Sequence, residues 1–263
     1  MCPRPRLPRH RSARFGLALL LGAAALPAGA ALAPASPEYL ADVDAKVEFA
    51  YLTEDRKALE HLRTDLKPFK DSERPLELYA YAHAEFRAEQ LAFWQHAGRE
   101  AGEAGENCLG ALDRRAERLA KDAEGAALAA ACAGYLAELG ALKHLTAAHH
   151  RDASLESARS LAPANPRVLL VGAINDWIAA RTPAQRAATR GAFERAAQAF
   201  ETVAVSLPGE PTWGGAEAWL FVGRAFEEAG NLVGARSAYE RALLVAPDFA
   251  AARRRLARLS GKR

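Results

Sequence analysis

Residues 216–247 constrain the fold of this chain more than any other segment. Large apolar or aromatic side chains alternate there with small ones, at spacings that fit two helices joined by a tight turn. The positions that carry the pattern are Trp219, Val222, Gly223, Phe226, Ala235, Tyr239, Ala242 and Pro247. A helical hairpin cannot bury both of its apolar faces alone, so the pattern predicts packing against neighbouring hairpins.

The turn and the seam of this hairpin follow from small residues. Gly230 and Asn231 suit the end of the first helix and the N-cap of the second. We expect Gly223 to face Ala235, because small side chains let two helix backbones approach closely. Pro247 is expected to end the unit, since a residue before proline disfavours the helical conformation.

This segment resembles the tetratricopeptide repeat (TPR), whose repeats of about 34 residues carry a similar pattern. Five positions match by identity and three by type, the latter being Val222, Phe226 and Tyr239. The resemblance implies an all-α fold, an array of antiparallel helical hairpins that forms a TPR-like α-solenoid. It also implies a non-catalytic protein that binds another protein or a peptide.

In TPR proteins the first helix of each pair lines the concave face of the solenoid. The resemblance therefore implies a partner-binding surface made of Leu169, Ala173, Asp176, Trp177, Leu220, Arg224, Glu227 and Glu228. Arg224 would pair with a partner carboxylate, and Trp177 would supply an apolar anchor. A polar helix end at Asp176 and a core position for Trp177 are the open alternative. The lysines and asparagines with which some TPR proteins clamp a C-terminal carboxylate are not present.

A second TPR-like unit is expected at residues 164–208. Its register is carried by Gly172, Ala196, Phe200 and Pro208. Gly172 and Ala196 are 24 residues apart, whereas Gly223 and Ala235 are 12 apart, so this unit has extra residues around its turn. The sequence Thr182-Pro183-Ala184-Gln185 predicts a capping box, and we expect one long second helix from Thr182 to about Ser206.

Residues 36–163 are expected to form degenerate helical hairpins, and residues 248–263 a C-terminal capping helix. The expected helices span residues 39–51, 54–66, 76–96, 108–120 and 126–145, with a further helix ending near Pro163. Pro68, Gly105, Gly125 and Pro163 are interpreted as separators between helices. Together with the C-terminal units this gives about eleven helices.

Residues 1–35 have the layout of a secretory signal peptide. Five arginines and no acidic residue precede an uncharged apolar run at residues 15–26. Cleavage is expected after Ala30 or Ala35. This predicts a periplasmic or secreted protein, and an uncleaved segment that anchors the chain in the inner membrane is the alternative.

Removal of this segment changes the charge of the chain. The full sequence has 35 Lys and Arg against 32 Asp and Glu, and without the five arginines the mature chain has 30 basic and 32 acidic residues. No strongly basic footprint for nucleic acid remains. For Cys108 and Cys132 we place a turn near Gly125, which offsets the two by about 15 Å and favours free thiols.

Catalytic and metal-binding motifs were sought in the sequence without success. Phosphate-binding glycine loops, H-E-x-x-H and G-x-S-x-G are all absent, and we expect neither a cofactor nor a metal. Adjacent His149 and His150 point about 100° apart on a helix and chelate one ion poorly. Two functions remain open: a scaffold for a protein or peptide partner, or an accessory subunit of an envelope transport or assembly system. The second would hold a small solute between helices near Trp94, Trp177 and Trp213.

Overall fold

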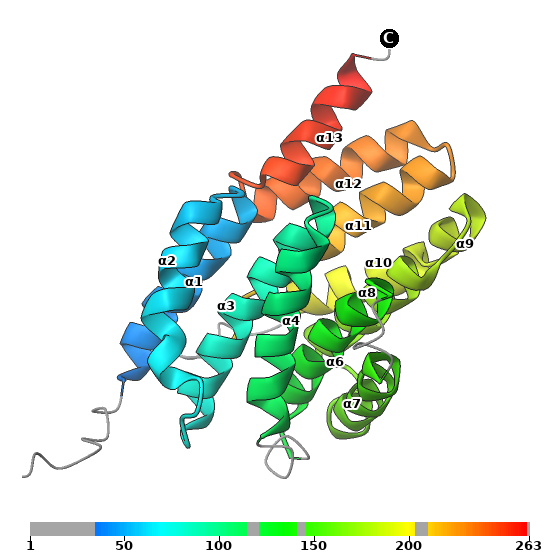
Figure 1. Cartoon of the computed structure of the whole chain (residues 1–263). Coiled ribbons are helices and arrows are strands. Elements are labelled where there is room, and N and C mark those ends of the chain that lie inside the picture. Colours follow the sequence, from blue (N-terminus) through cyan, green and yellow to red (C-terminus); the bar gives the residue numbers. More distant parts are fainter. Residues whose placement is uncertain (1–34, 115–120, 141–145, 203–209, 262–263) are drawn as a thin grey trace, which may run out of the picture. The chain divides into compact units, whose positions relative to one another are not determined.

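The computed structural model describes residues 35–114, 121–140, 146–202 and 210–261, and within these ranges the chain is helical and has no strand (Figure 1). Its helices are α1 (Pro37–Leu52), α2 (Arg56–Leu66), a 3-10 turn η1 (Lys67–Phe69), α3 (Pro75–Trp94), α4 (Gly98–Asp113), α6 (Ala123–Glu138), α7 (Ala147–Leu161), α8 (Pro166–Ala179), α9 (Pro183–Ala188), α10 (Arg190–Thr202), α11 (Gly215–Glu228), α12 (Leu232–Val245) and α13 (Ala250–Ser260). The all-α prediction is confirmed for this part of the chain. The expected signal peptide lies almost entirely outside it.

Short polar side chains and prolines set where many of these helices begin. Side chains at the N-caps accept hydrogen bonds from backbone N–H groups of the first turn at Ser36, Asp55, Asp122, Asn165, Thr182 and Asn231. Proline follows directly at the starts of α1, α8 and α9, where its missing N–H costs no helical hydrogen bond. These starts are therefore determined locally.

Consecutive helices pack as pairs, most closely α3 with α4, α6 with α7, and α11 with α12. Helix α6 packs against four other helices, α3, α4, α7 and α8 (Figure 1). Every residue from Gly125 to Leu136 in α6 is buried, as expected for a helix that is apolar all round. Helices α1 and α2 both pack on α3, and α10 lies between α8 and α11.

The first helix also reaches the last ones. The hydroxyl of Tyr51 in α1 donates to Glu217 Oε1 in α11 at 3.1 Å, and the Tyr51 ring lies 6.4 Å from that of Phe249, just before α13. Arg254 Nη1 of α13 donates to Glu54, which follows α1, at 2.7 Å. The side of α11 that carries Glu217 is thus covered by a helix from the other end of the chain. We call this the inner side of α11.

Helices α11 and α12 form the predicted pair of helices joined by a tight turn. Gly230 has a positive φ of 73°, and the Asn231 side chain accepts from Gly234 N at 2.9 Å. The nearest atoms to Gly223 belong to Tyr239 of α12, and a Cβ at Gly223 would collide with the ring of Tyr239. The missing side chain makes room for an aromatic ring.

The expected long second helix at residues 182–206 is divided. Thr182 and Gln185 form the predicted capping box, but α9 ends at Ala188 and α10 begins at Arg190. The hydroxyl of Thr189 donates to the Arg186 carbonyl at 2.7 Å, which competes with helix continuation at this point. Residues 203–208, the expected end of this helix, lie outside the described part of the chain.

Two glycines that were interpreted as separators lie inside helices. Gly105 is buried in α4, where a Cβ would collide with the Glu89 carboxyl group, and Gly125 is in the first turns of α6. Gly105 therefore serves close packing between α4 and α3 instead of ending a helix. For this reason α4 begins ten residues earlier than the predicted start at residue 108.

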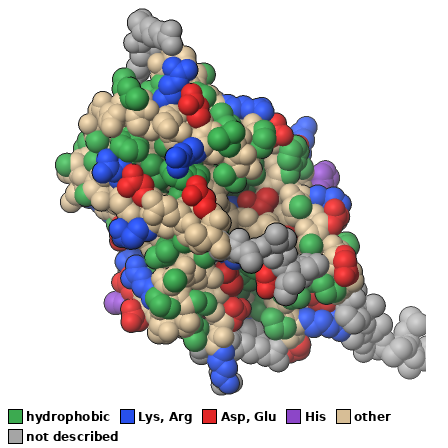
Figure 2. Space-filling view, turned by 180° about the vertical axis from the view of Figure 1, so that it is seen from behind, with side chains coloured by type: hydrophobic (Ala, Val, Ile, Leu, Met, Phe, Trp, Pro, Cys, Tyr) green, Lys and Arg blue, Asp and Glu red, His purple; other side chains and the backbone are tan. Residues whose placement is uncertain are grey.

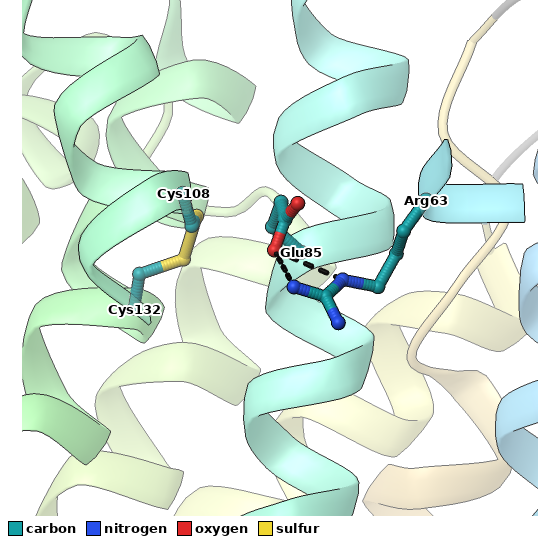
Figure 3. Close-up of a disulfide and its surroundings, with 4 residues drawn as sticks. All are labelled: Arg63, Glu85, Cys108 and Cys132. Carbon is teal, nitrogen blue, oxygen red and sulfur yellow. Dashed lines mark hydrogen bonds and ion pairs between the residues drawn. A yellow bond between two sulfur atoms is a disulfide. The ribbon is translucent and has the colours of Figure 1, made fainter. Parts of the chain in front are cut away.

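Cys108 and Cys132 form a disulfide, so the expectation of free thiols is wrong. Cys108 and Cys132 have Cα atoms 6.4 Å apart and join α4 to α6 (Figure 3). The misplaced turn explains the error. Cys108 lies five residues before the end of α4, and Cys132 lies nine after the start of α6. This reduces the offset to about 6 Å.

Among the residues that the structure describes, no helix is both long enough and apolar enough to cross a bilayer. On the face seen in Figure 2, acidic and basic side chains are interspersed.

Candidate functional site

A buried arginine joins both ends of the fold. Arg87 of α3 is fully buried, and its Nε and Nη2 donate to Glu48 Oε1 and Oε2 of α1 at 2.5 and 2.8 Å. Its Nη2 also donates to Glu217 Oε2 of α11 at 2.6 Å. Two carboxylates from opposite ends of the sequence therefore share one guanidinium.

The remaining oxygen of Glu217 is also satisfied. Glu217 Oε1 accepts from Gln90 Nε2 at 2.8 Å and from the Tyr51 hydroxyl at 3.1 Å, and Gln90 also accepts from Arg87 Nη1 at 2.5 Å. The Arg87 guanidinium lies 4.2 Å from the centre of the Tyr51 ring, at cation–π distance. We call this set the Arg87 centre: Glu48, Tyr51, Arg87, Gln90 and Glu217.

The electrostatics of this centre keep its ions charged. Burial opposes the charge on Arg87, but Glu217 and Glu48 outweigh it and hold the pKa of Arg87 well above its ordinary value. Burial likewise opposes the charge on Glu48, but Arg87 and His83 lower its pKa. Both carboxylates pair with the one guanidinium, so the centre joins α1, α3 and α11 and holds no buried ion without an oppositely charged partner.

His83 extends the polar cluster towards the loop before α11. Its Nδ1 lies 2.8 Å from Asp44 Oδ1 and its Nε2 3.0 Å from Glu48 Oε1, at ion-pair distance but without hydrogen-bond alignment. Burial lowers the pKa of His83, but the two carboxylates reverse this effect and raise it. The ring stacks on Trp213, with centroids 5.8 Å apart.

Trp213 fills the core beside this cluster. It is buried, and its Nε1 donates to the Tyr79 hydroxyl at 2.9 Å. Trp213, which the sequence placed beside a possible solute site, is thus part of the core.

A second arginine lies in a pocket at the surface. The pocket has a volume of about 260 Å³ and opens between α1, α3, α11 and α13. Its apolar lining is formed by Tyr51, Leu91, Trp94, Leu220, Phe221, Phe249 and Ala251, and its charged lining by Glu54, Arg224, Arg254, Arg255 and Arg258. We call this the Arg224 pocket.

Arg224 has aromatic neighbours but no counter-ion. Its guanidinium carbon lies 4.4 Å from the Trp94 ring centre, 4.9 Å from Trp177 and 5.0 Å from Phe221. It makes no hydrogen bond or ion pair with any residue that the structure describes, and its Nε is buried without a partner. Burial, and then repulsion from Arg255, lower its pKa to about 10. Arg224 is therefore still charged at neutral pH.

The neighbouring arginines differ from Arg224 in this respect. Arg254 pairs with Glu54, and Arg255 Nη1 lies 2.6 Å from Glu227 Oε2. Arg258 is exposed at the rim. The charge that remains uncompensated inside the pocket is that of Arg224.

A larger hollow of about 380 Å³ lies between α1, α10, α11 and the end of α12. Phe200, Trp213 and Trp219 are among its walls, together with Glu48 and Glu217. These two carboxylates already pair with Arg87, so the hollow has no comparable unpaired buried charge.

The structure divides the residues predicted to bind a partner. Leu220 and Arg224 line the pocket, and Trp177 is buried against Arg224, which supports its alternative as a core residue. The other five do not join this site: Ala173 is buried, Leu169 packs partly buried against the core, Asp176 is exposed, Glu227 binds Tyr239 and Arg255, and Glu228 binds Arg186.

On α11, positions next to the predicted binding residues pack against α3 of the same chain. Arg87, Gln90 and Trp94 of α3 contact Glu217 and Phe221 there. Sequence reasoning named Trp94 only as a possible wall of a solute site, and it missed Tyr51, Leu91 and Phe249, which come from other elements. No local signal marks Leu91, because α3 is buried on nearly every side and has no distinct apolar stripe.

With this geometry established, we compared the chain with known proteins. No known family model matches it, and no curated protein matches it. Within the described ranges, no cluster of three or more His, Cys, Asp or Glu side chains is arranged to hold a metal ion. The functional interpretation consequently depends on the chemistry of the two arginine sites.

Proposed function

We propose that this protein is a non-catalytic binding protein of the bacterial cell envelope, built as a TPR-like helical-repeat scaffold, and that it holds its ligand in the Arg224 pocket. The observation that carries this proposal is the Arg224 guanidinium, which is charged, largely buried and without a counter-ion beside an open pocket. A buried unpaired cation costs free energy in the unliganded fold. A ligand with a complementary anion would remove that cost.

The disulfide supports a location in the periplasm or outside the cell. Disulfides persist in oxidising compartments and are rare in the cytosol. The Cys108–Cys132 bond therefore agrees with the export signal expected at residues 1–35. Anchoring by an uncleaved N-terminal segment would also place the folded part of the chain in such a compartment.

The dimensions of the site favour a small solute over an extended peptide. An extended peptide would need a long open face, whereas the inner side of α11 is occupied by α3 and α1. A pocket of about 260 Å³ fits a small molecule or one side chain. This is the property expected of an accessory subunit in an envelope transport or assembly system.

A scaffold for a protein partner is the second candidate, and exposed apolar side chains on α12 favour it. Val233 and Leu244 are 82% and 83% exposed. They are eleven residues apart, which places them on the same side of the helix. A partner that docks on α12 would cover both.

One purification tests both candidates. The mature protein is isolated from envelope extract and denatured, and the released small molecules are identified by mass spectrometry. The control is Arg253→Gln, because Arg253 is exposed on α13. We expect one small molecule to be released from wild type and from the control, but not from Arg224→Gln. A wild-type protein that releases nothing, or an Arg224→Gln protein that releases the same molecule, would contradict the pocket proposal. A stoichiometric protein partner that is lost from a Val233→Glu, Leu244→Glu variant would support the second candidate.

A further inference from the structure

We propose that the ligand of the Arg224 pocket is a small organic carboxylate with one negative charge and an apolar body about the size of a ring. This inference rests on the proposed function, since it names the class of molecule that the same pocket would bind. Three features of the pocket lead to it: the free edge of the guanidinium, the balance of charge and the apolar walls.

The surroundings of Arg224 leave mainly its edge available. Trp94, Trp177 and Phe221 lie close to the guanidinium at cation–π distance. The N–H donors of a guanidinium point outward in its plane, in a fork that matches the two oxygens of a carboxylate. Nε is sealed off without a partner, but the terminal nitrogens are not enclosed in this way and make no hydrogen bond to described residues. They are the donors that a ligand would meet.

The charge balance of the pocket suits a single negative charge. Glu54 already neutralises Arg254, and Glu227 neutralises Arg255. These two pairs leave Arg224 as the inner cation and Arg258 at the exposed rim. A dianion such as inorganic phosphate would bring one charge more than the inner site neutralises.

The walls of the pocket require an apolar body on the ligand. Leu91 and Trp94 of α3 face the pocket together with Leu220 and Phe221 of α11, and Phe249 closes it beside α13. Removal of such surface from water is favourable in proportion to the apolar area buried. Acetate or phosphate would pair with Arg224 but leave these walls hydrated, so both are expected to bind more weakly than a carboxylate with a larger apolar group.

The test compares five probes: benzoate, hexanoate, acetate, inorganic phosphate and benzyl alcohol. Binding to the purified mature protein is measured by isothermal titration calorimetry and by tryptophan fluorescence, to which Trp94 and Trp177 beside Arg224 contribute. We expect benzoate or hexanoate to bind at least tenfold more tightly than acetate, phosphate or benzyl alcohol. The last probe has the apolar body but no charge.

Variants then assign the binding to Arg224. Arg224→Gln should bind the organic carboxylate at least tenfold more weakly than wild type. Arg224→Lys keeps the charge but loses the planar fork, so its affinity should lie between those of Arg224→Gln and wild type. Arg253→Gln, on the same helix as Arg254 but paired with Asp248 outside the pocket, should bind as wild type does. Circular dichroism checks that each variant is folded.

Other outcomes would overturn the inference and still leave the proposed function to its own test. Phosphate that binds as tightly as benzoate, with both lost in Arg224→Gln, would show an anion site without selectivity for an apolar body. Benzyl alcohol that matches benzoate would show that the carboxylate contributes nothing. If no probe binds at millimolar concentration, the ligand class is wrong, whereas a molecule released from the envelope-purified protein would still establish a binding pocket.

Discussion

Arg87 and Arg224 are both buried to a large extent and both lie against aromatic rings, but they differ in their counter-ions. Arg87 binds Glu48 and Glu217, and these carboxylates raise its pKa. Arg224 has no such partner, and burial lowers its pKa to about 10. The positive charge of an arginine is therefore stabilised by carboxylates at position 87 and is uncompensated at position 224.

This difference teaches how two buried cations take different roles. A charge that is fully paired inside the fold fixes the helices that carry its partners. A charge that is buried without a partner weakens the free protein and is retained more readily where a ligand completes it. Arg87 connects the two ends of the fold, and we propose that Arg224 binds the ligand.

Replacement of Arg87 is expected to have the largest effect. Arg87→Met would remove the guanidinium that Glu48 and Glu217 share and leave Glu48 with His83 as its remaining ion-pair partner. Removing one partner of a buried ion pair costs about 3–5 kcal/mol of unfolding free energy. Urea denaturation followed by circular dichroism measures this loss. The matched control is Arg236→Met, whose exposed pair with Glu240 should contribute less than about 1 kcal/mol. If Arg87→Met loses no more unfolding free energy than the control does, Arg87 has no structural role.

Neutralisation of one carboxylate should have a smaller effect. Glu217→Gln keeps the shape of the side chain, and Arg87 retains Glu48. We expect a loss of about 1–3 kcal/mol, because a hydrogen bond to a charged group is replaced by a neutral one. Glu228→Gln on the same helix is the control, since its pair with Arg186 is partly exposed. Equal unfolding free energies for the two variants would mean that burial of the pair does not matter.

Replacement of Arg224 is expected to act in the opposite direction. Arg224→Met removes a buried charge and keeps an apolar side chain near Trp94 and Trp177. We expect the unliganded protein to gain about 1 kcal/mol in unfolding free energy and to lose ligand binding. Thermal unfolding with and without benzoate measures both. If Arg224→Met is less stable than wild type, Arg224 stabilises the fold, as Arg87 does.

The smallest effect is expected for Glu89, a buried acid without a partner in the described part of the chain, which can be compared with the unpaired Arg224. Glu89 is fully buried, its carboxyl oxygens have no hydrogen-bond partner among the described residues, and burial raises its pKa well above 4.5. Its stabilising contribution as a neutral group is therefore complete below pH 4.5 and is lost as the pH rises through its folded-state pKa.

Glu89→Gln cannot ionise, so its unfolding free energy should fall less steeply with pH than that of wild type. Urea denaturation at several pH values from 4.5 to 9 gives the two slopes. His83, whose pKa is also raised, is present in both proteins and cancels in the difference. Identical slopes would show that Glu89 finds a partner in solution.

The parts of this fold that could be predicted are those governed by neighbours in sequence. The hairpin of α11 and α12, the break at Gly230 and the capping box at Thr182 all depend on contacts within a few residues. Errors arose where a glycine serves packing between distant helices. Gly105 was interpreted as a separator because its contact, Glu89, lies on another helix.

The candidate site was predicted only in part for a similar reason. The resemblance to TPR proteins pointed to Arg224 and Leu220 on α11, which do line the pocket. It could not supply Trp94 or Phe249, because they come from α3 and from the start of α13. It also included Glu227 and Glu228, whose actual partners are other residues of this chain.

By itself the sequence determined where many helices start, where the last hairpin turns and which residue types are available for binding. These features follow from hydrogen bonds between residues two to four positions apart. Only the tertiary structure decided which arginine has a counter-ion. Glu217 reaches Arg87 across 130 residues of sequence, and the same folding leaves Arg224 unpaired seven residues further along α11. The physical reason is that an ion pair depends on separation in space, which the order of residues alone does not fix.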